Sequence, residues 1–183
     1  MSKPSLVIVI VEDEHHEMLV RRYLKKRGMG PHQVTYLRSP SGEGSAEQWV
    51  RTRFAKEVSA YRNRRARAET ALILIIDADI QTVQGRLAQI DRGLGEARIQ
   101  AIDNSEQIAR LVPKRNVETW ILCLNGQLVD ENTDYNKTRD DWNELIPPAA
   151  EALFQWTRPR VRAQVHCINS LLSGIRELNR LRF

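Results

Sequence analysis

Three carboxylates in this sequence are placed where they could bind one divalent metal ion together. Glu12 follows the apolar run Leu6–Val11, and Asp77 and Asp79 follow the apolar run Ala71–Ile76. Continuous aliphatic runs of this length are typical of strands that a parallel sheet buries on both faces. Acids at the ends of two such strands repel one another unless a cation balances their charge. We therefore expect a Mg²⁺ or Mn²⁺ site, although an isolated Asp-x-Asp pair could also simply cap the next helix.

The segment Pro113–Trp120 supplies further charged groups at a predicted strand-to-helix boundary. Lys114 and Arg115 could neutralise charge that develops on a phosphoryl group. Glu118 could join the metal ligands, or it could lie in the first turn of a helix capped by Asn116, where the helix dipole favours a carboxylate. We expect Glu12, Lys114 and Glu118 to be catalytic and Arg115 to contact nucleic acid.

Two histidines begin the helix that is predicted after the first strand. His16 could be a further metal ligand or a proton-transfer group, and Glu17 could support the same site from the first helical turn. Paired histidines at a helix start, here His15 and His16, can equally be exposed surface residues. The sequence leaves both interpretations open.

Four strands and six helices are expected around these residues. The strands are predicted at Leu6–Val11, Gln33–Leu37, Ala71–Ile76 and Ile108–Val112. The helices are predicted at about His15–Arg27, Ala46–Ala60, Thr82–Leu94, Asn116–Leu124 and Ala149–Gln155, with a terminal helix from about Arg160. This alternation predicts an α/β fold with a mostly parallel, Rossmann-like sheet flanked by helices. Right-handed crossovers would bring Glu12, Asp77 and Asp79 to one edge of that sheet.

The chain divides into two predicted parts. Residues 1–126 contain every predicted strand and form the α/β domain. Residues 127–183 contain an acidic loop and a helical C-terminal extension, which we expect to pack on that domain.

Charge is segregated along the chain, whose formal net charge is +5. Residues 51–70 hold seven basic residues against two acids, and residues 130–151 hold seven acids against two basic residues. We predict that four arginines of the basic run bind a nucleic-acid backbone, although such a run can also be a solvated helix face. These arginines are Arg62, Arg64, Arg65 and Arg67.

The sequence has no segment typical of membrane or secreted proteins. Its apolar runs are far shorter than the roughly 18 residues of a membrane helix, and the N-terminus does not resemble a signal peptide. Cys123 and Cys167 are too few and too far apart for a disulfide or zinc framework, so we expect two core cysteines in a reducing compartment. We predict a cytoplasmic protein without a membrane partner.

The acidic residues and their neighbours resemble the Toprim domain of topoisomerases, primases, small nucleases and overcoming-lysogenization-defect nucleases. The resemblance rests on Glu12 after the first strand and on Ile75–Asp79, which reads Ile-Ile-Asp-Ala-Asp, after a later one. It implies a Toprim-like fold and a metal-dependent phosphodiester enzyme with Glu12, Asp77 and Asp79 at the metal. The sequence departs from the Toprim pattern at Asp13 and shortly after Asp79, where that family carries glycines.

The chain is also similar, over most of its length, to bacterial proteins that share two segments with it. One is the Glu-Asp-x-x-His-Glu start, here Glu12–Glu17. The other is Pro-Lys-Arg-Asn-[Val/Ile]-Glu-Thr-Trp, here Pro113–Trp120. Stand-alone Toprim-like proteins of this kind resemble components of anti-phage systems, so the resemblance implies a nuclease that acts on DNA or RNA.

Two other functions fit the same residues. The first is a non-catalytic Toprim-like module that binds nucleic acid or a partner ATPase through its basic faces. The second is a receiver-like domain, in which Glu12 and Asp13 would bind Mg²⁺ and Asp77 would accept a phosphoryl group. The 65 residues between Glu12 and Asp77 and the order Pro113-Lys114, the reverse of the receiver's Lys-Pro, disfavour the receiver.

Overall fold

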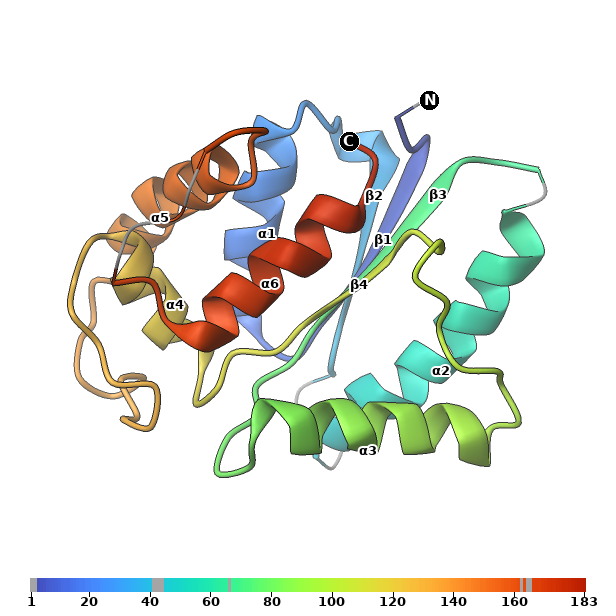
Figure 1. The fold of residues 1–183 in the computed structure, drawn as a ribbon, viewed down its shortest axis with the longest axis horizontal. Helices are drawn as coiled ribbons and strands as arrows, with labels where there is room; N and C mark the ends of the chain where they lie inside the picture. Colours follow the sequence, from blue (N-terminus) through green and yellow to red (C-terminus); the bar gives the residue numbers. More distant parts are fainter. Residues whose placement is uncertain (1–2, 41–44, 66, 162, 164–165) are drawn as a thin grey trace.

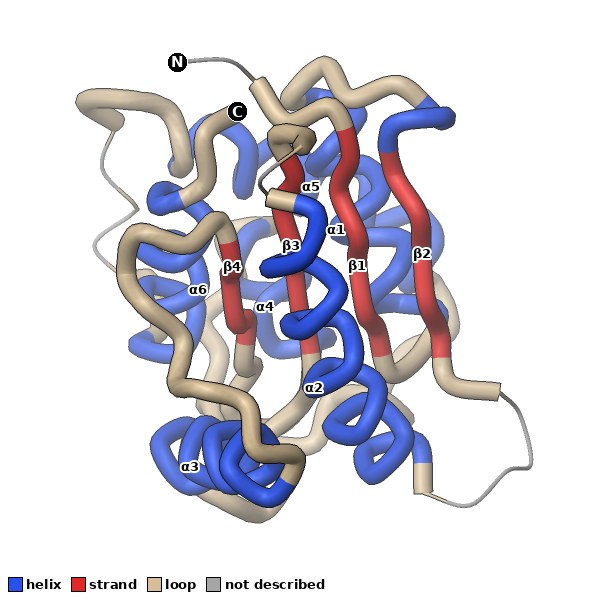
Figure 2. The backbone as a smooth tube through the Cα atoms, turned by 90° about the vertical axis from the view of Figure 1, so that its right-hand side faces the viewer, coloured by secondary structure: helices blue, strands red, loops and turns tan. Residues whose placement is uncertain are grey.

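The computed structural model describes residues 3–40, 45–65, 67–161, 163 and 166–183. Its centre is a four-stranded sheet in which all paired strands are parallel. Figure 2 shows the strands side by side in the order β2-β1-β3-β4. They are β1 (Leu6–Val11), β2 (Val34–Arg38), β3 (Thr70–Ile75) and β4 (Ile108–Leu111). The predicted α/β fold with a parallel sheet is therefore confirmed.

Six α-helices of the described residues cover the two faces of the sheet. They are α1 (Glu14–Lys26), α2 (Ala46–Arg64), α3 (Val83–Glu96), α4 (Val117–Leu124), α5 (Trp142–Trp156) and α6 (Asn169–Arg180). A short 3-10 helix, η1 (Pro31–Gln33), precedes β2. Figure 1 shows α1, α4, α5 and α6 on one side of the sheet and α2 and α3 on the other. Each side has its own hydrophobic core, because alternate residues of a strand point to opposite faces.

The order of the strands determines where a ligand site is expected. β1 and β3 are the central strands and pair along their whole length, from Leu6 with Thr70 to Val11 with Ile75. The chain passes from β1 to β2 on one side and then crosses to β3 on the other. This reversal makes the carboxyl ends of β1 and β3 the topological switch point, where doubly wound sheets bind their ligands.

Polar caps fix the starts of four helices near that edge of the sheet. The capping residues are Asp13, Ser45, Thr82 and Asn116, and each side chain accepts a hydrogen bond from the backbone N–H three residues later. Such caps satisfy backbone donors that would otherwise lack a partner at the helix start. The caps of α1, α3 and α4 follow β1, β3 and β4, so the loops between them hold the polar residues of the switch point in fixed conformations.

The two C-terminal helices differ from the sequence prediction. Helix α5 begins at Trp142 rather than near Ala149, although Pro147 and Pro148 lie inside it and remove two backbone donors. Burial of Trp142 and Ile146 in the core outweighs that loss. The predicted terminal helix from Arg160 is also wrong at its start. Arg160 has φ of +67°, which a right-handed helix does not allow, and α6 begins only at Asn169.

The C-terminal helices pack on the sheet and protect one of its edges. Residues of α5 and α6 belong to the same hydrophobic core as β1 and α1. Glu177 of α6 accepts a hydrogen bond of 2.9 Å from the backbone N–H of Arg110, on the outer strand β4. This contact removes a free donor from an edge strand, which is where sheets tend to aggregate. Among the described residues, every helix is too short or too polar to cross a membrane.

Candidate metal centre

Three side chains meet at the switch point and offer ligand atoms to one position. Glu12 extends from the end of β1, Asp77 follows β3, and His16 comes from the first turn of α1. One ligand atom from each residue lies within 4.8 Å of the others. Asp77 and His16 are buried, and Glu12 is half-buried. The predicted pair of Glu12 and Asp77 is thus brought together, with a histidine as the third member.

Hydrogen bonds hold this cluster in a defined geometry. His16 Nε2 lies 2.9 Å from Asp77 Oδ1, and His16 Nδ1 lies 2.8 Å from Asp13 Oδ1. Asp13 also caps α1 by accepting the backbone N–H of His16 at 3.0 Å. The Glu12 carboxylate accepts the backbone N–H of Asp77 at 3.3 Å, which ties the ends of β1 and β3 together. The cap of α1 therefore also orients the imidazole.

Burial and neighbouring charges alter the protonation of the cluster. Burial raises the pKa of Glu12 and raises that of Asp77 to about 7, and the charge of His16 only partly offsets the latter shift. Burial alone would lower the pKa of His16, but Asp77 and Asp13 hold it well above its ordinary value. The positive imidazole is thus the internal counter-ion of two carboxylates. A divalent cation could take over this role, since two carboxylates and one imidazole suit such an ion.

Asp79, the third predicted ligand, lies beside the cluster but points elsewhere. Its Oδ2 accepts a hydrogen bond of 3.2 Å from Arg86 Nη2, and its side chain is 54% exposed. Its φ of +55° lies in the left-handed region, which turns the chain sharply after Ala78. Within the described residues, the compact ligand cluster includes Glu12 and Asp77 but not Asp79.

Arg86 of α3 was not expected from the sequence, and it supports the turn that carries both aspartates. The side chain is buried and donates from Nε to the backbone oxygen of Asp77 at 2.8 Å. It also binds Gln89 at 2.9 Å and forms an ion pair with Glu47 at the start of α2. A buried arginine is favourable only when its donors are satisfied, and these partners satisfy it. The sequence of α3 reads as an ordinary amphipathic helix, so it does not identify Arg86 as a buried residue.

Glu118 forms a second pair with His15 next to the acidic cluster. Glu118 is buried in the first turn of α4, as predicted, and its Oε1 lies 2.6 Å from His15 Nδ1. This hydrogen bond raises the pKa of His15. The side chain of His15 is 27% exposed, so part of it is accessible to solvent. Glu118 therefore orients a histidine, and the compact cluster does not include it.

Lys114 and Arg115 lie at the same edge of the sheet, in the loop from β4 to α4. Arg115 donates to Asp134 at 3.3 Å, and Asn116 donates to the same carboxylate at 2.8 Å. The acidic stretch thus folds back onto the start of α4. Lys114 is half-buried near Asp130 and makes no ion pair in the described part of the chain. Lys114 is therefore the freer of these two cations.

The predicted arginine run lies at the opposite edge of the sheet. Helix α2 starts at the carboxyl edge and ends where β3 begins, as Figure 2 shows. Three arginines at the end of α2 and just after it bind carboxylates of the protein: Arg62 and Arg65 bind Glu106, and Arg64 binds Glu57. Arg67 is exposed just beyond the helix. The structure does not bring these arginines and the acidic cluster together.

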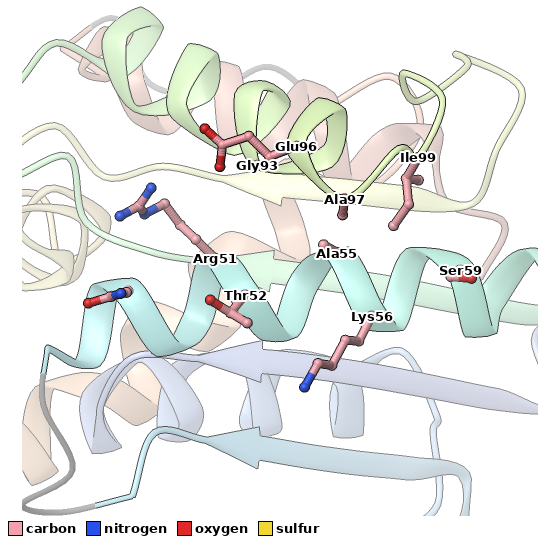
Figure 3. Close-up of a pocket in the computed structure, with 10 residues that line it drawn as sticks. Arg51, Thr52, Ala55, Lys56, Ser59, Gly93, Glu96, Ala97 and Ile99 are labelled. Carbon is pink, nitrogen blue, oxygen red and sulfur yellow. The ribbon is translucent and has the colours of Figure 1, made fainter.

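A groove of about 790 Å³ lies between α2 and the end of α3, and Figure 3 shows its walls. It is lined by charged side chains such as Arg51, Lys56 and Glu96 and by small ones such as Ala55 and Ala97. No member of the acidic cluster lines it. Its size alone does not supply chemistry, so the switch point is the better candidate for a functional site.

The chain was compared with models of protein families, with curated proteins and with solved structures. No family model, curated protein or solved structure matches it.

Proposed function

We propose that this protein cleaves phosphodiester bonds of nucleic acid with the help of a divalent metal ion. The observation that carries the proposal is the cluster at the switch point, where Glu12 and Asp77 from two central strands converge with a buried His16. A buried carboxylate and a half-buried one at a ligand-binding edge are costly unless a positive charge balances them, and a bound cation would supply that charge. The resemblance to Toprim nucleases, which rests on Glu12 and Ile75–Asp79, points to the same chemistry.

Each residue has a distinct part in the proposed reaction. Glu12, Asp77 and His16 would hold the ion, which supplies Lewis-acid stabilisation of charge on a phosphoryl oxygen. Lys114 would bind the phosphate from the loop after β4. The His15–Glu118 pair would transfer a proton at Nε2 of His15, with Glu118 fixing the ring.

The proposal is tested with the wild type and Asp77→Asn. Binding of Mn²⁺ and Mg²⁺ is measured by calorimetry, and both proteins are then incubated with plasmid DNA and with single-stranded RNA. We expect the wild type to bind metal and to cut at least one substrate, and we expect Asp77→Asn to lose both properties. The substitution keeps the size of the side chain, so circular dichroism should show an intact fold.

Asp91→Asn is the matched control, because Asp91 is half-exposed on α3 and pairs with Arg110 at the surface. This variant should bind metal and cleave like the wild type. Full metal binding and cleavage by Asp77→Asn would show that the site has been assigned wrongly.

A second candidate function is a non-catalytic module that binds nucleic acid or a partner ATPase. The observation in its favour is that the acids already have internal partners, since His16 balances Asp77 and Arg86 binds Asp79. This function predicts no metal binding and no cleavage by the wild type. The basic end of α2 would then be the surface to test for nucleic acid.

A receiver-like function has less support from the site. Its phosphoacceptor would be Asp77, but that side chain is only 11% exposed and is hydrogen-bonded to His16. Asp13, the second acid of the receiver's pair, caps α1 instead.

The proposed nuclease would act in the cytoplasm, and its resemblance to stand-alone Toprim-like proteins suggests a role in defence against phage.

A further inference from the structure

His16 distinguishes this cluster from a site made of carboxylates alone. Its ring is fully buried, and its Nε2 points toward Asp77 and Glu12. Asp79, which the sequence predicts as the third oxygen ligand, is turned toward Arg86. The third position of the donor set is therefore occupied by a nitrogen.

The ring is oriented in the way that metal-binding histidines usually are. Its Nδ1 is hydrogen-bonded to the Asp13 carboxylate, which is fixed because it also caps α1. Metal-binding histidines commonly donate their second ring nitrogen to a carboxylate, which fixes the tautomer and the direction of the ring. The contact between His16 Nδ1 and Asp13 is of this kind.

We infer that His16 is a direct ligand of the metal through Nε2, which would release the proton that this nitrogen shares with Asp77, and that the site prefers Mn²⁺ to Mg²⁺. This inference rests on the proposed metal site and specifies its chemistry. Mg²⁺ takes oxygen ligands almost exclusively, whereas imidazole suits first-row transition ions. A donor set of two carboxylates and one imidazole therefore disfavours Mg²⁺.

The direct test is pulsed electron paramagnetic resonance of the full chain with one equivalent of Mn²⁺. We expect modulation from a coordinated ¹⁴N, which changes to the ¹⁵N pattern when the protein is made with ¹⁵N-histidine. His16→Asp should lose this signal while keeping three carboxylates for the ion. His15→Gln is the matched control, because His15 adjoins His16 on the same helix turn but binds Glu118, and this variant should keep the signal.

Calorimetry tests the preference between the two ions. In the wild type we expect Mn²⁺ to bind more tightly than Mg²⁺ by roughly tenfold or more, and His16→Asp should narrow that ratio. Asp13→Asn keeps His16 but weakens its support, so Mn²⁺ affinity should fall by roughly 10–100-fold. This variant and the wild-type spectrum keep the test valid if His16→Asp does not fold.

The outcomes separate this inference from the proposed function. Stoichiometric Mn²⁺ binding without nitrogen modulation, or equal affinities for Mn²⁺ and Mg²⁺, would overturn the inference and leave the metal site in place. A wild-type protein that binds neither ion would overturn both. Nitrogen modulation that is lost in His16→Asp and kept in His15→Gln would establish the ligand.

Discussion

At the scale of single residues, Asp77 and Asp79 lie two positions apart but have different environments. Asp77 is buried at the ends of the central strands, and its carboxylate is hydrogen-bonded to His16. Asp79, two residues later, is half-exposed and hydrogen-bonded to Arg86. The backbone causes this difference. Asp79 has a left-handed conformation, which directs its side chain away from the cluster that contains Asp77. Spacing in the sequence does not reveal such a turn.

We expect Asp79→Asn to retain most of the metal affinity that Asp77→Asn loses. Asparagine tolerates the left-handed region well, so the turn should keep its shape. The neutral side chain should weaken the contact with Arg86 and reduce Mn²⁺ affinity by no more than about tenfold, as for a residue outside the ligand set. Calorimetry on the two variants side by side provides the measurement. If Asp77→Asn and Asp79→Asn lost Mn²⁺ affinity equally, Asp79 would be a direct ligand, as the resemblance to Toprim domains implies.

The sequence predicts part of this site well and part of it poorly, for physical reasons. Glu12 and Asp77 could be identified because each follows a buried aliphatic strand, and parallel topology brings such positions together. The bond between His15 and Glu118 joins residues 103 positions apart, and no local pattern encodes it. Arg86 was missed for the same reason, since a buried arginine is recognised only by the partners that tertiary structure gives it.

At the scale of helices and strands, the basic end of α2 anchors the helix to the loop before β4. Arg62 binds both oxygens of Glu106 at 2.8 and 2.9 Å, and it donates to two backbone oxygens of the same loop. Glu106 is buried and also accepts the backbone N–H of Asp103 at 2.9 Å. The charges of this run therefore have a structural task in addition to any contact with nucleic acid.

We expect Glu106→Gln to destabilise the protein at neutral pH and to lose that effect in acid. The hydrogen bonds from Arg62 lower the pKa of Glu106 below its ordinary value. A carboxyl group whose pKa is lower in the folded state stabilises the fold above its ordinary pKa, and this stabilisation disappears as the pH falls through the folded-state pKa. The variant should lose about 2 kcal/mol at pH 7, and the gap should narrow below about pH 4. Urea unfolding at several pH values measures this.

Glu151→Gln provides the control for this measurement. Glu151 forms an ion pair with Lys26 at the surface, where water screens the charges, so its loss should hardly change the stability at any of these pH values. A gap between wild type and Glu106→Gln that stayed constant down to pH 3 would contradict the ionised pair at the end of α2.

At the scale of the whole molecule, the C-terminal part of the chain folds back and contacts α4 again. The sequence leaves α4 after Cys123, passes through the acidic stretch and α5, and returns at Cys167 just before α6. The Cys123 thiol donates to the backbone oxygen of His166 at 4.0 Å, which brings it next to Cys167, although 44 positions separate the two cysteines. The prediction of two separate core cysteines did not include this contact, because the strand and helix patterns give no information on where the chain returns.

The contact predicts that a mild oxidant links the two cysteines. The neighbouring Cys167 thiol lowers the pKa of the Cys123 thiol to about 7, so more of it is thiolate at neutral pH than for an ordinary cysteine. The thiolate attacks hydrogen peroxide to give a sulfenic acid and water, and the Cys167 thiol then displaces a second water to form the disulfide. Closing a loop of this length should make the oxidised protein more stable than the reduced one by up to about 4 kcal/mol.

Mass spectrometry should then show a loss of two hydrogen atoms per chain and a single linked peptide pair, and thermal unfolding should shift upward. Cys167→Ser should instead stop at an oxidised Cys123 and gain no stability. Independent overoxidation of both sulfurs in the wild type, without a linked pair, would show that the segment before α6 does not hold Cys167 against α4. The path of the C-terminal extension across α4 would then need revision, whereas the sheet and the acidic cluster, which lie outside that loop, would not.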